Sequence, residues 1–166
     1  DRKFLNYKFN DTYYKVPTYG RIYKIIDFGR AIYNYRGKLL CSDSFHAKGD
    51  AATQYNIEPY FNKHKPRLEP NKSFDLCRLA CSLYDYFSEY VDDINNTKNK
   101  VAEIINDWCK DDKGRNILYK KCGEERYPEF KLYKMIARTV HNHIPIKQLD
   151  KKYFNIFITN KTYSKK

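Results

Sequence analysis

Apolar and polar residues alternate at the start of the chain. Aromatic and aliphatic side chains are interleaved with polar ones over residues 4–9 and 13–16, and Asn10 and Asp11 lie between the two runs. Period-two alternation on both sides of a short polar turn is typical of a β-hairpin. A second turn over residues 17–20, followed by a β-branched and aromatic run over residues 21–26, predicts a further strand. Small antiparallel β-structure is therefore expected first.

Helical periodicity replaces this alternation in the second half of the chain. Apolar residues spaced three and four apart predict a helix over residues 74–90, whose apolar face comprises Leu76, Leu79, Ala80, Leu83 and Phe87. Asn71 or Ser73 is available as its N-cap. Shorter patterns predict helices over residues 101–108 and 128–140 and at most one short helix within residues 146–157.

Residues 31–71 show little sustained periodicity, which predicts a long irregular segment between the strands and the helices. Strands followed by helices define a segregated α+β fold. The expected organisation is one domain over residues 1–166, with a β-hairpin and strand over residues 1–26 and a helical part over residues 74–166.

The charge of the chain suggests an anionic partner, but the composition gives a simpler explanation. The formal net charge is +12, and Lys and Arg outnumber Asp and Glu by 32 to 20. Phe, Tyr, Asn, Lys and Ile, whose codons are all rich in A and T, supply 78 of the 166 residues. An AT-rich genome would produce this excess of Lys without selection for binding. Nucleic-acid binding is therefore a minor alternative. A protein partner or substrate is the other possibility, and the composition does not identify one.

The five cysteines form no pattern typical of a disulfide framework or a zinc site. They are odd in number and include no CxxC pair. Cys77 and Cys81 stand one helical turn apart, but no four-ligand arrangement with His141 and His143 is evident in the sequence. Reduced, buried thiols are expected. No apolar run is long enough to cross a membrane.

One tripeptide carries candidate chemistry. Asp27-Phe28-Gly29 directly follows the apolar pair Ile25-Ile26. With the flanking residues 16–20 and 30–33, and the segments 54–56 and 70–75, this run resembles the kinase-like proteins of nucleocytoplasmic large DNA viruses, whose genomes suit the AT-rich composition. The resemblance covers the central third of the chain most strongly.

The resemblance implies the C-lobe of a protein-kinase-like fold and a magnesium-ATP site. Asp27 would hold the Mg²⁺ that bridges the ATP phosphates, Phe28 would pack beneath it, and Gly29 would let the backbone turn. Residues 27–59 would form an activation-type segment ending at Ile57-Glu58-Pro59, which resembles a permuted A-P-E motif. The same tripeptide is also ordinary turn chemistry at the end of a strand.

Two further structural roles follow from the resemblance. Asp75, at the start of the predicted helix, would accept hydrogen bonds from the catalytic-loop backbone, and Arg126 would pair with Glu58. A first-turn acid is also favourable in any helix because of the helix dipole, which leaves a second interpretation of Asp75 open.

The sequence departs from the kinase pattern where catalysis would occur. No H-x-D-x-x-x-x-N motif, no glycine-rich loop and no N-lobe lysine is found in these residues, so no catalytic residue is assigned. One hypothesis is the C-terminal part of a serine/threonine kinase-like, ATP-dependent phosphotransferase, which would be inactive as this chain alone. The other is a pseudokinase or virion component that uses the fold as a binding scaffold. The expected location is the cytoplasm of an infected cell or the virion.

Overall fold

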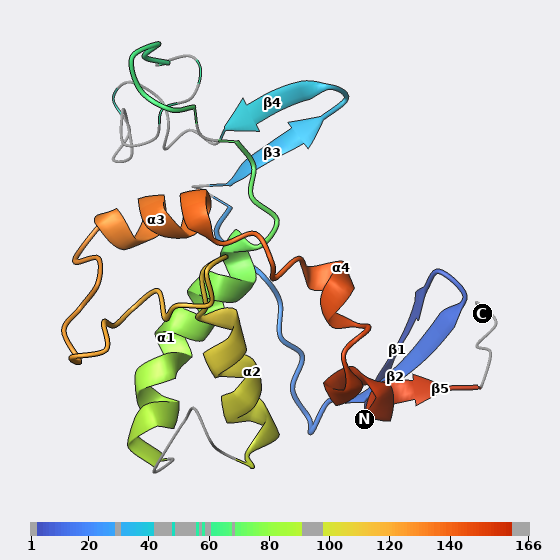
Figure 1. The fold of residues 1–166 in the computed structure, drawn as a ribbon. Coiled ribbons are helices and arrows are strands. Elements are labelled where there is room, and N and C mark those ends of the chain that lie inside the picture. Colours follow the sequence, from blue (N-terminus) through green and yellow to red (C-terminus); the bar gives the residue numbers. More distant parts are fainter. Residues whose placement is uncertain are drawn as a thin grey trace. The chain divides into compact units, whose positions relative to one another are not determined.

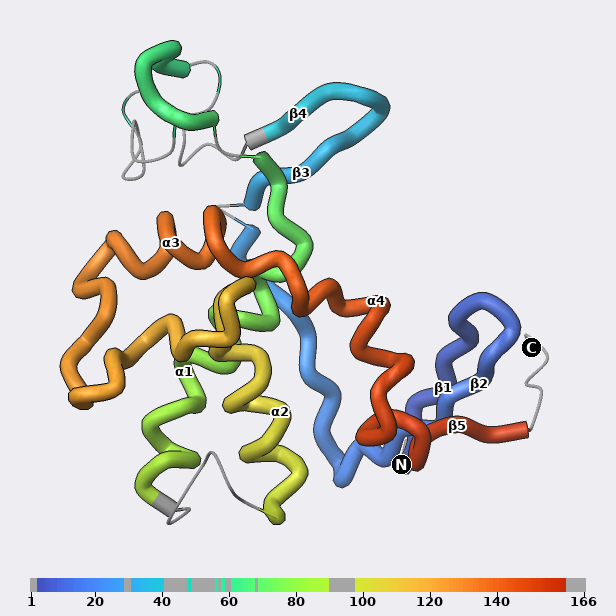
Figure 2. Tube along the Cα trace, in the orientation of Figure 1, coloured from blue at the N-terminus to red at the C-terminus, as the bar shows by residue number. Residues whose placement is uncertain are grey.

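The computed structural model forms two compact units, one made from residues 1–26 and 146–166 and the other from residues 27–145. Its small antiparallel sheets and several helices confirm the predicted α+β class (Figures 1 and 2). The structure describes residues 3–28, 31–41, 48, 56, 58, 61–67, 69–90 and 98–160.

A three-stranded antiparallel sheet forms the first unit. The predicted hairpin is confirmed: β1 (Phe4–Phe9) pairs with β2 (Thr12–Pro17), and Asn10 takes a positive φ of 50° in the turn between them. Asn tolerates this left-handed conformation better than most residues. The third strand, β5 (Ile158–Thr159), comes from the other end of the chain and pairs with β2.

The prediction of a strand over residues 21–26 is wrong. Arg21 donates its backbone N–H to Thr18, but Ile22 to Ile26 belong to no sheet and make no hydrogen bond within the part of the chain that the structure describes. Figure 2 shows this segment as a drawn-out trace after β2. The residue types favour a strand, but a strand also requires a neighbour for its backbone groups.

The C-terminal part of the chain contains two short helical pieces where at most one was predicted. They are α4 (Pro145–Gln148) and the 3₁₀ helix η2 (Lys152–Phe157), which leads directly into β5. The sequence of η2 contains several aromatic residues, and its pattern did not predict that a strand follows.

A second hairpin lies within the segment predicted to be irregular. Strand β3 (Ile32–Tyr35) pairs with β4 (Lys38–Cys41), and Arg36 and Gly37 form the two-residue turn with φ angles of 48° and 76°. Two successive positive φ values are the signature of a type I′ hairpin turn. Most of residues 42–60 lie outside the described part of the chain.

Helix α1 (Phe74–Tyr90) has the bounds predicted and supplies the centre of the core. Figure 1 shows it beside α2 (Lys100–Trp108), which also matches its prediction. The apolar face was assigned slightly wrongly, because Leu79 is 48% exposed. The buried residues of α1 are Cys77, Ala80, Cys81 and Tyr84, and Leu83 and Phe87 pack against them, so the buried face is displaced around the helix from the predicted one.

Helix α3 (Lys131–Thr139) begins three residues later than the prediction from Pro128. Glu129 has a φ of 54°, which a right-handed helix does not accommodate, and the residues before Lys131 form turns instead. Ile136 of α3 and Val140 just after it are fully buried in the same core as α1 and α2.

The start of α1 is tied to the end of α3 by one side chain. The amide nitrogen of Asn71 donates to the carbonyl oxygens of Ile136, Ala137 and Val140 at 3.4, 3.0 and 2.9 Å. The amide oxygen of Asn71 accepts from the N–H of Ser73 at 2.8 Å. The Ile136 carbonyl also accepts from the backbone N–H of Val140. Carbonyls at a helix C-terminus generally have no partner within the helix, so Asn71 supplies a donor where this end of α3 needs one.

A long connection over residues 109–130 is ordered by buried polar groups. Asp111, whose side chain is almost fully buried, accepts from the backbone N–H groups of Lys113 and Arg115 at 3.0 and 2.9 Å and pairs with the Arg115 guanidinium at 2.7 Å. Burial raises the pKa of Asp111, but the hydrogen bonds from Arg115 and Lys113 outweigh it and hold the pKa below its usual value of 3.8.

Replacing Asn71 with Ala should destabilise the second unit by about 2–3 kcal/mol, because two short hydrogen bonds are lost and the carbonyls at the end of α3 lose their donor. Asn71→Asp should cost at least as much, since it places a carboxylate against those oxygens. Urea unfolding followed by fluorescence of Trp108, the single tryptophan, which packs against this core, measures the change. The exposed Asn142→Ala serves as the control and should change stability by less than about 0.5 kcal/mol. A loss below about 1 kcal/mol for Asn71→Ala would contradict this role.

Asp111 should make the same unit sensitive to acid. The pKa of Asp111 is lower in the folded protein than in the unfolded chain. Its contribution to the free energy of unfolding is therefore complete above the unfolded-state pKa of about 3.9 and is lost as the pH falls through the lower folded-state pKa. Asp111→Asn should therefore reduce stability by on the order of 1–2 kcal/mol at neutral pH, with a smaller difference near pH 3. Trp108 fluorescence in urea at both pH values tests this, with the exposed Asp150→Asn as control. A difference that stays constant with pH would disprove the assignment.

Candidate functional site

Asp27 lies in an unusual backbone conformation. Its φ is 59°, in the left-handed region that non-glycine residues seldom occupy, and its side chain is exposed. Such conformations often occur at functional sites, where the surrounding structure holds them. They also occur in ordinary turns, and the Ala31 N–H donates to the Phe28 carbonyl at 3.0 Å just beyond it. The geometry is compatible with both interpretations of the tripeptide.

The other two residues of the tripeptide add little to the site. Phe28 is 66% exposed, so it is not packed in the way that the resemblance implies. Gly29 lies outside the described residues, as do Ile57 and Pro59 on either side of Glu58. The site that the sequence predicted is therefore represented here mainly by the carboxylate of Asp27.

The predicted pairing of Glu58 with Arg126 is wrong. Glu58 forms a bidentate ion pair with Arg67, nine residues further along the chain. The Nη1 atom of Arg67 donates to Oε2 at 2.9 Å, and its Nη2 atom donates to Oε1. Arg126 instead donates to the backbone carbonyls of Asn116 and Tyr119 at 2.7 and 3.1 Å. A nearby arginine forms the ion pair at little entropic cost, while Arg126 stabilises the loop after α2.

Asp75 occupies the first turn of α1 and is exposed. A negative charge there is favourable because the amide groups at a helix N-terminus carry partial positive charge. This position agrees with the simpler of the two interpretations. The predicted hydrogen bonds to a catalytic loop stay a prediction.

Three thiols lie together in the core between α1 and α2. Cys77, Cys81 and Cys109 are buried and free, and Cys122 is exposed. A hydrogen bond to Cys81 and burial raise the pKa of Cys77 and of Cys109 above the usual value, so both stay protonated at neutral pH. Within the described residues, no group of three or more His, Cys, Asp or Glu side chains is placed to hold a metal ion.

Sequence reasoning missed a contact between two exposed side chains on different segments. The Nδ1 atom of His141 lies 2.6 Å from a carboxylate oxygen of Asp112, and the backbone N–H of His141 donates to the other oxygen at 2.7 Å. The two residues are 29 positions apart, and no motif joins them. The pair fixes the orientation of the imidazole ring.

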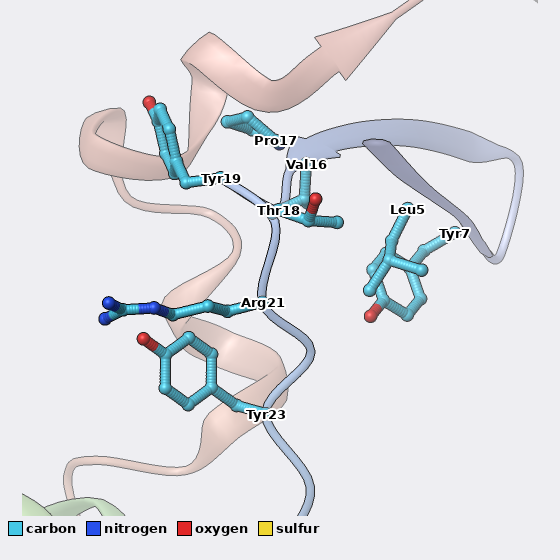
Figure 3. A pocket seen from close by; sticks show the side chains of 8 residues that line it. All are labelled: Leu5, Tyr7, Val16, Pro17, Thr18, Tyr19, Arg21 and Tyr23. Atoms are coloured by element: carbon cyan, nitrogen blue, oxygen red, sulfur yellow. The ribbon is translucent and has the colours of Figure 1, made fainter. Parts of the chain in front are cut away.

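One pocket in the described part of the chain belongs to the first unit. Its volume is about 550 Å³, and it is lined by side chains of β1, β2 and the turn after β2, together with Arg21 and Tyr23. Figure 3 shows Arg21 and Tyr23 side by side on one side of their segment, with Leu5 and Tyr7 on the other. The pocket is open and mixes aromatic, aliphatic and cationic groups, which suits a peptide side chain better than a buried cofactor.

Comparison with known proteins identifies no relative: no family model, curated protein or solved structure matches the chain. None of the described helices has the length and apolar character that crossing a lipid bilayer requires. The kinase-like resemblance is thus carried by the quoted motifs alone.

The separate partners of Glu58 and Arg126 can be tested with a double-mutant cycle. Arg126→Ala should destabilise the second unit by about 1–3 kcal/mol because two loop carbonyls lose a charged donor. Glu58→Ala removes an exposed pair worth roughly 0.2–1 kcal/mol. The coupling between the two changes should be below about 0.5 kcal/mol in urea unfolding. A coupling energy above about 1 kcal/mol would show that Glu58 and Arg126 interact, as the sequence predicted.

Proposed function

We propose that this chain is the C-terminal part of a viral kinase-like phosphotransferase and that Asp27 is its ligand for magnesium-ATP. The observation that supports the proposal most is the left-handed backbone conformation of Asp27, which follows an extended segment. The carboxylate of Asp27 is exposed to solvent at this point. A residue in this conformation costs on the order of 1 kcal/mol or more. This conformation in a tripeptide that resembles the kinase motif supports a role in binding over simple turn chemistry.

The residues present fit Mg²⁺ only when the phosphates are supplied with it. Asp27 offers a hard oxygen ligand, as Mg²⁺ requires, but the described residues contain no cluster that would complete a protein cage. Mg²⁺ commonly binds through one or two carboxylates together with water and substrate phosphates. When bound, the ion would neutralise the phosphate charge, and the part of Asp27 would be to orient it.

A catalytic role for the chain on its own is not part of the proposal. Phosphoryl transfer depends on groups positioned from both lobes, including a base for the substrate hydroxyl and a lysine for the phosphates. The 166 residues offer no H-x-D-x-x-x-x-N motif and no glycine-rich loop. The chain alone is therefore expected to transfer no phosphate and to bind magnesium-ATP too weakly to detect.

In the full-length protein, replacing Asp27 should weaken magnesium-ATP binding by about tenfold or more, a change of about 1.4 kcal/mol. Asp27→Asn is the sharper variant because Asn tolerates the same positive φ while removing the charge. Asp27→Ala removes the ligand altogether. Calorimetric titration of magnesium-ATP into each variant measures the effect.

An exposed acid outside the site, Asp150, provides the matched control, and Asp150→Asn should bind like the wild type. Equal binding by the wild type and both Asp27 variants would mean that Asp27 only forms a turn. Phosphate transfer by the 166-residue chain alone, lost in Asp27→Asn, would show that catalysis had been assigned to the wrong part of the protein.

A binding scaffold without catalysis is the second candidate function. It is favoured by the large apolar side chains exposed just before Asp27, where Tyr23, Ile25 and Ile26 are 85%, 82% and 78% exposed. If the full-length protein does not bind magnesium-ATP, the result will support the binding scaffold. If the full-length protein has phosphotransferase activity that depends on Asp27, the result will support the enzyme.

A further inference from the structure

We propose that residues 21–26 form a docking edge for an extended, acidic segment of another polypeptide, which adds to this chain as a β-strand. The proposal does not depend on Asp27 or on magnesium-ATP. It rests on the backbone, the exposed side chains and the charge of this segment and on the pocket beside it.

The backbone of the segment has unused hydrogen-bonding capacity. Ile22 to Ile26 are five consecutive residues that make no hydrogen bond within the part of the chain that the structure describes. None of them has a positive φ, and the trace is drawn out in Figure 2. Backbone N–H and C=O groups in a row are a template for pairing with another strand. The occupant is therefore expected to be a peptide backbone and not a small molecule.

The side chains indicate that such a strand would be covered on both faces. Successive side chains of an extended chain point to opposite faces. Ile22 and Ile26 would share one face, and Tyr23 and Ile25 the other. Free surfaces seldom keep neighbouring aliphatic side chains as exposed as Ile25 and Ile26, and contiguous patches of this kind mark interaction sites.

The charge of the segment selects among extended partners. Arg21 and Lys24 are exposed, and residues 12–26 contain Lys15 as well but no carboxylate. Opposite charges across a strand pair are stabilising, and like charges are destabilising. A second copy of this chain would place the same cations opposite each other, and each copy has a formal net charge of +12. An acidic partner is therefore favoured over self-association.

The pocket supplies a place for one side chain of that partner. Arg21 and Tyr23 both belong to the segment and to the pocket lining, and Figure 3 shows them side by side on one side of the backbone. In strand addition, backbone hydrogen bonds provide affinity while pockets for alternate side chains provide specificity. An aromatic or aliphatic side chain next to a carboxylate of the partner would fit the mixed lining of this pocket.

The probe is a synthetic peptide of about six to ten residues that carries one Glu opposite Arg21 and one Glu opposite Lys24, on the two faces of the strand, with Val and Tyr at the other positions. Fluorescence anisotropy with the 166-residue chain should show binding about tenfold tighter than for the same peptide with Lys in place of Glu. Hydrogen exchange should show slower exchange at amides between Ile22 and Ile26 when the peptide is bound. A peptide methylated on alternate backbone nitrogens should not bind, because it cannot pair as a strand.

Variants of exposed residues test the surface without disturbing the core. Ile25→Asp should abolish binding, whereas Ile156→Asp, at an isoleucine that is 78% exposed elsewhere in the same unit, should leave it unchanged. Lys24→Glu should weaken binding of the Glu peptide and strengthen binding of the Lys peptide. Equal binding of the Glu and Lys peptides, or binding of the methylated peptide, would overturn the proposal. So would concentration-dependent self-association that protects the same amides without peptide, since the occupant would then be a second copy.

Discussion

The hydrogen bonds of Asn71 are the constraint on which the second unit depends. One amide group joins the start of α1 to carbonyls at the end of α3, which are 65 to 69 residues further along the chain. Ser73, next to it, accepts a bond from the backbone of His143 at 3.1 Å, so the chain leaving α3 is held at the same point. The apolar core brings the helices together without direction, whereas these bonds define which ends meet.

Polar side chains perform the same task in the long connection between α2 and α3. Arg126 donates to two backbone carbonyls of this connection, and Asp111 accepts two of its backbone N–H groups. The connection contains isolated β-bridges and turns but no helix or strand, so its backbone hydrogen bonds form no continuous ladder. Side chains with several donors or acceptors replace the regular ladder that a helix or sheet would provide.

Much of the fold could be predicted from sequence because local signals were strong. The first hairpin has alternation and a turn pair at Asn10, and α1 has an apolar stripe with a capping residue before it. The hairpin turn at Arg36 and Gly37 was missed because arginine is an unusual residue at a positive φ. Strand β5 was missed because two residues that pair with a strand more than 140 positions away give no local pattern.

The candidate site could be predicted only in part. The role of Asp27 stays a prediction from its tripeptide, and its backbone angle is a feature that no sequence pattern gives. Arg126 was assigned to Glu58 by analogy, but the choice between Arg67 and Arg126 depends on distance in space. The exposure of residues 21–26 also could not be predicted, because their composition describes a strand and says nothing of whether a neighbour is present.

The first unit joins segments from opposite ends of the chain, which affects the order in which the protein is made. Strand β2 is synthesised early, but its partner β5 is added after more than 140 further residues. The second unit, which is continuous over residues 27–145, has been synthesised by then. Domains tend to fold as units during synthesis, so the helical unit should begin to fold before β5 pairs with the hairpin of β1 and β2. During that interval the edge of β2 that later pairs with β5 has no strand beside it, so the first sheet is completed only when the last part of the chain is made.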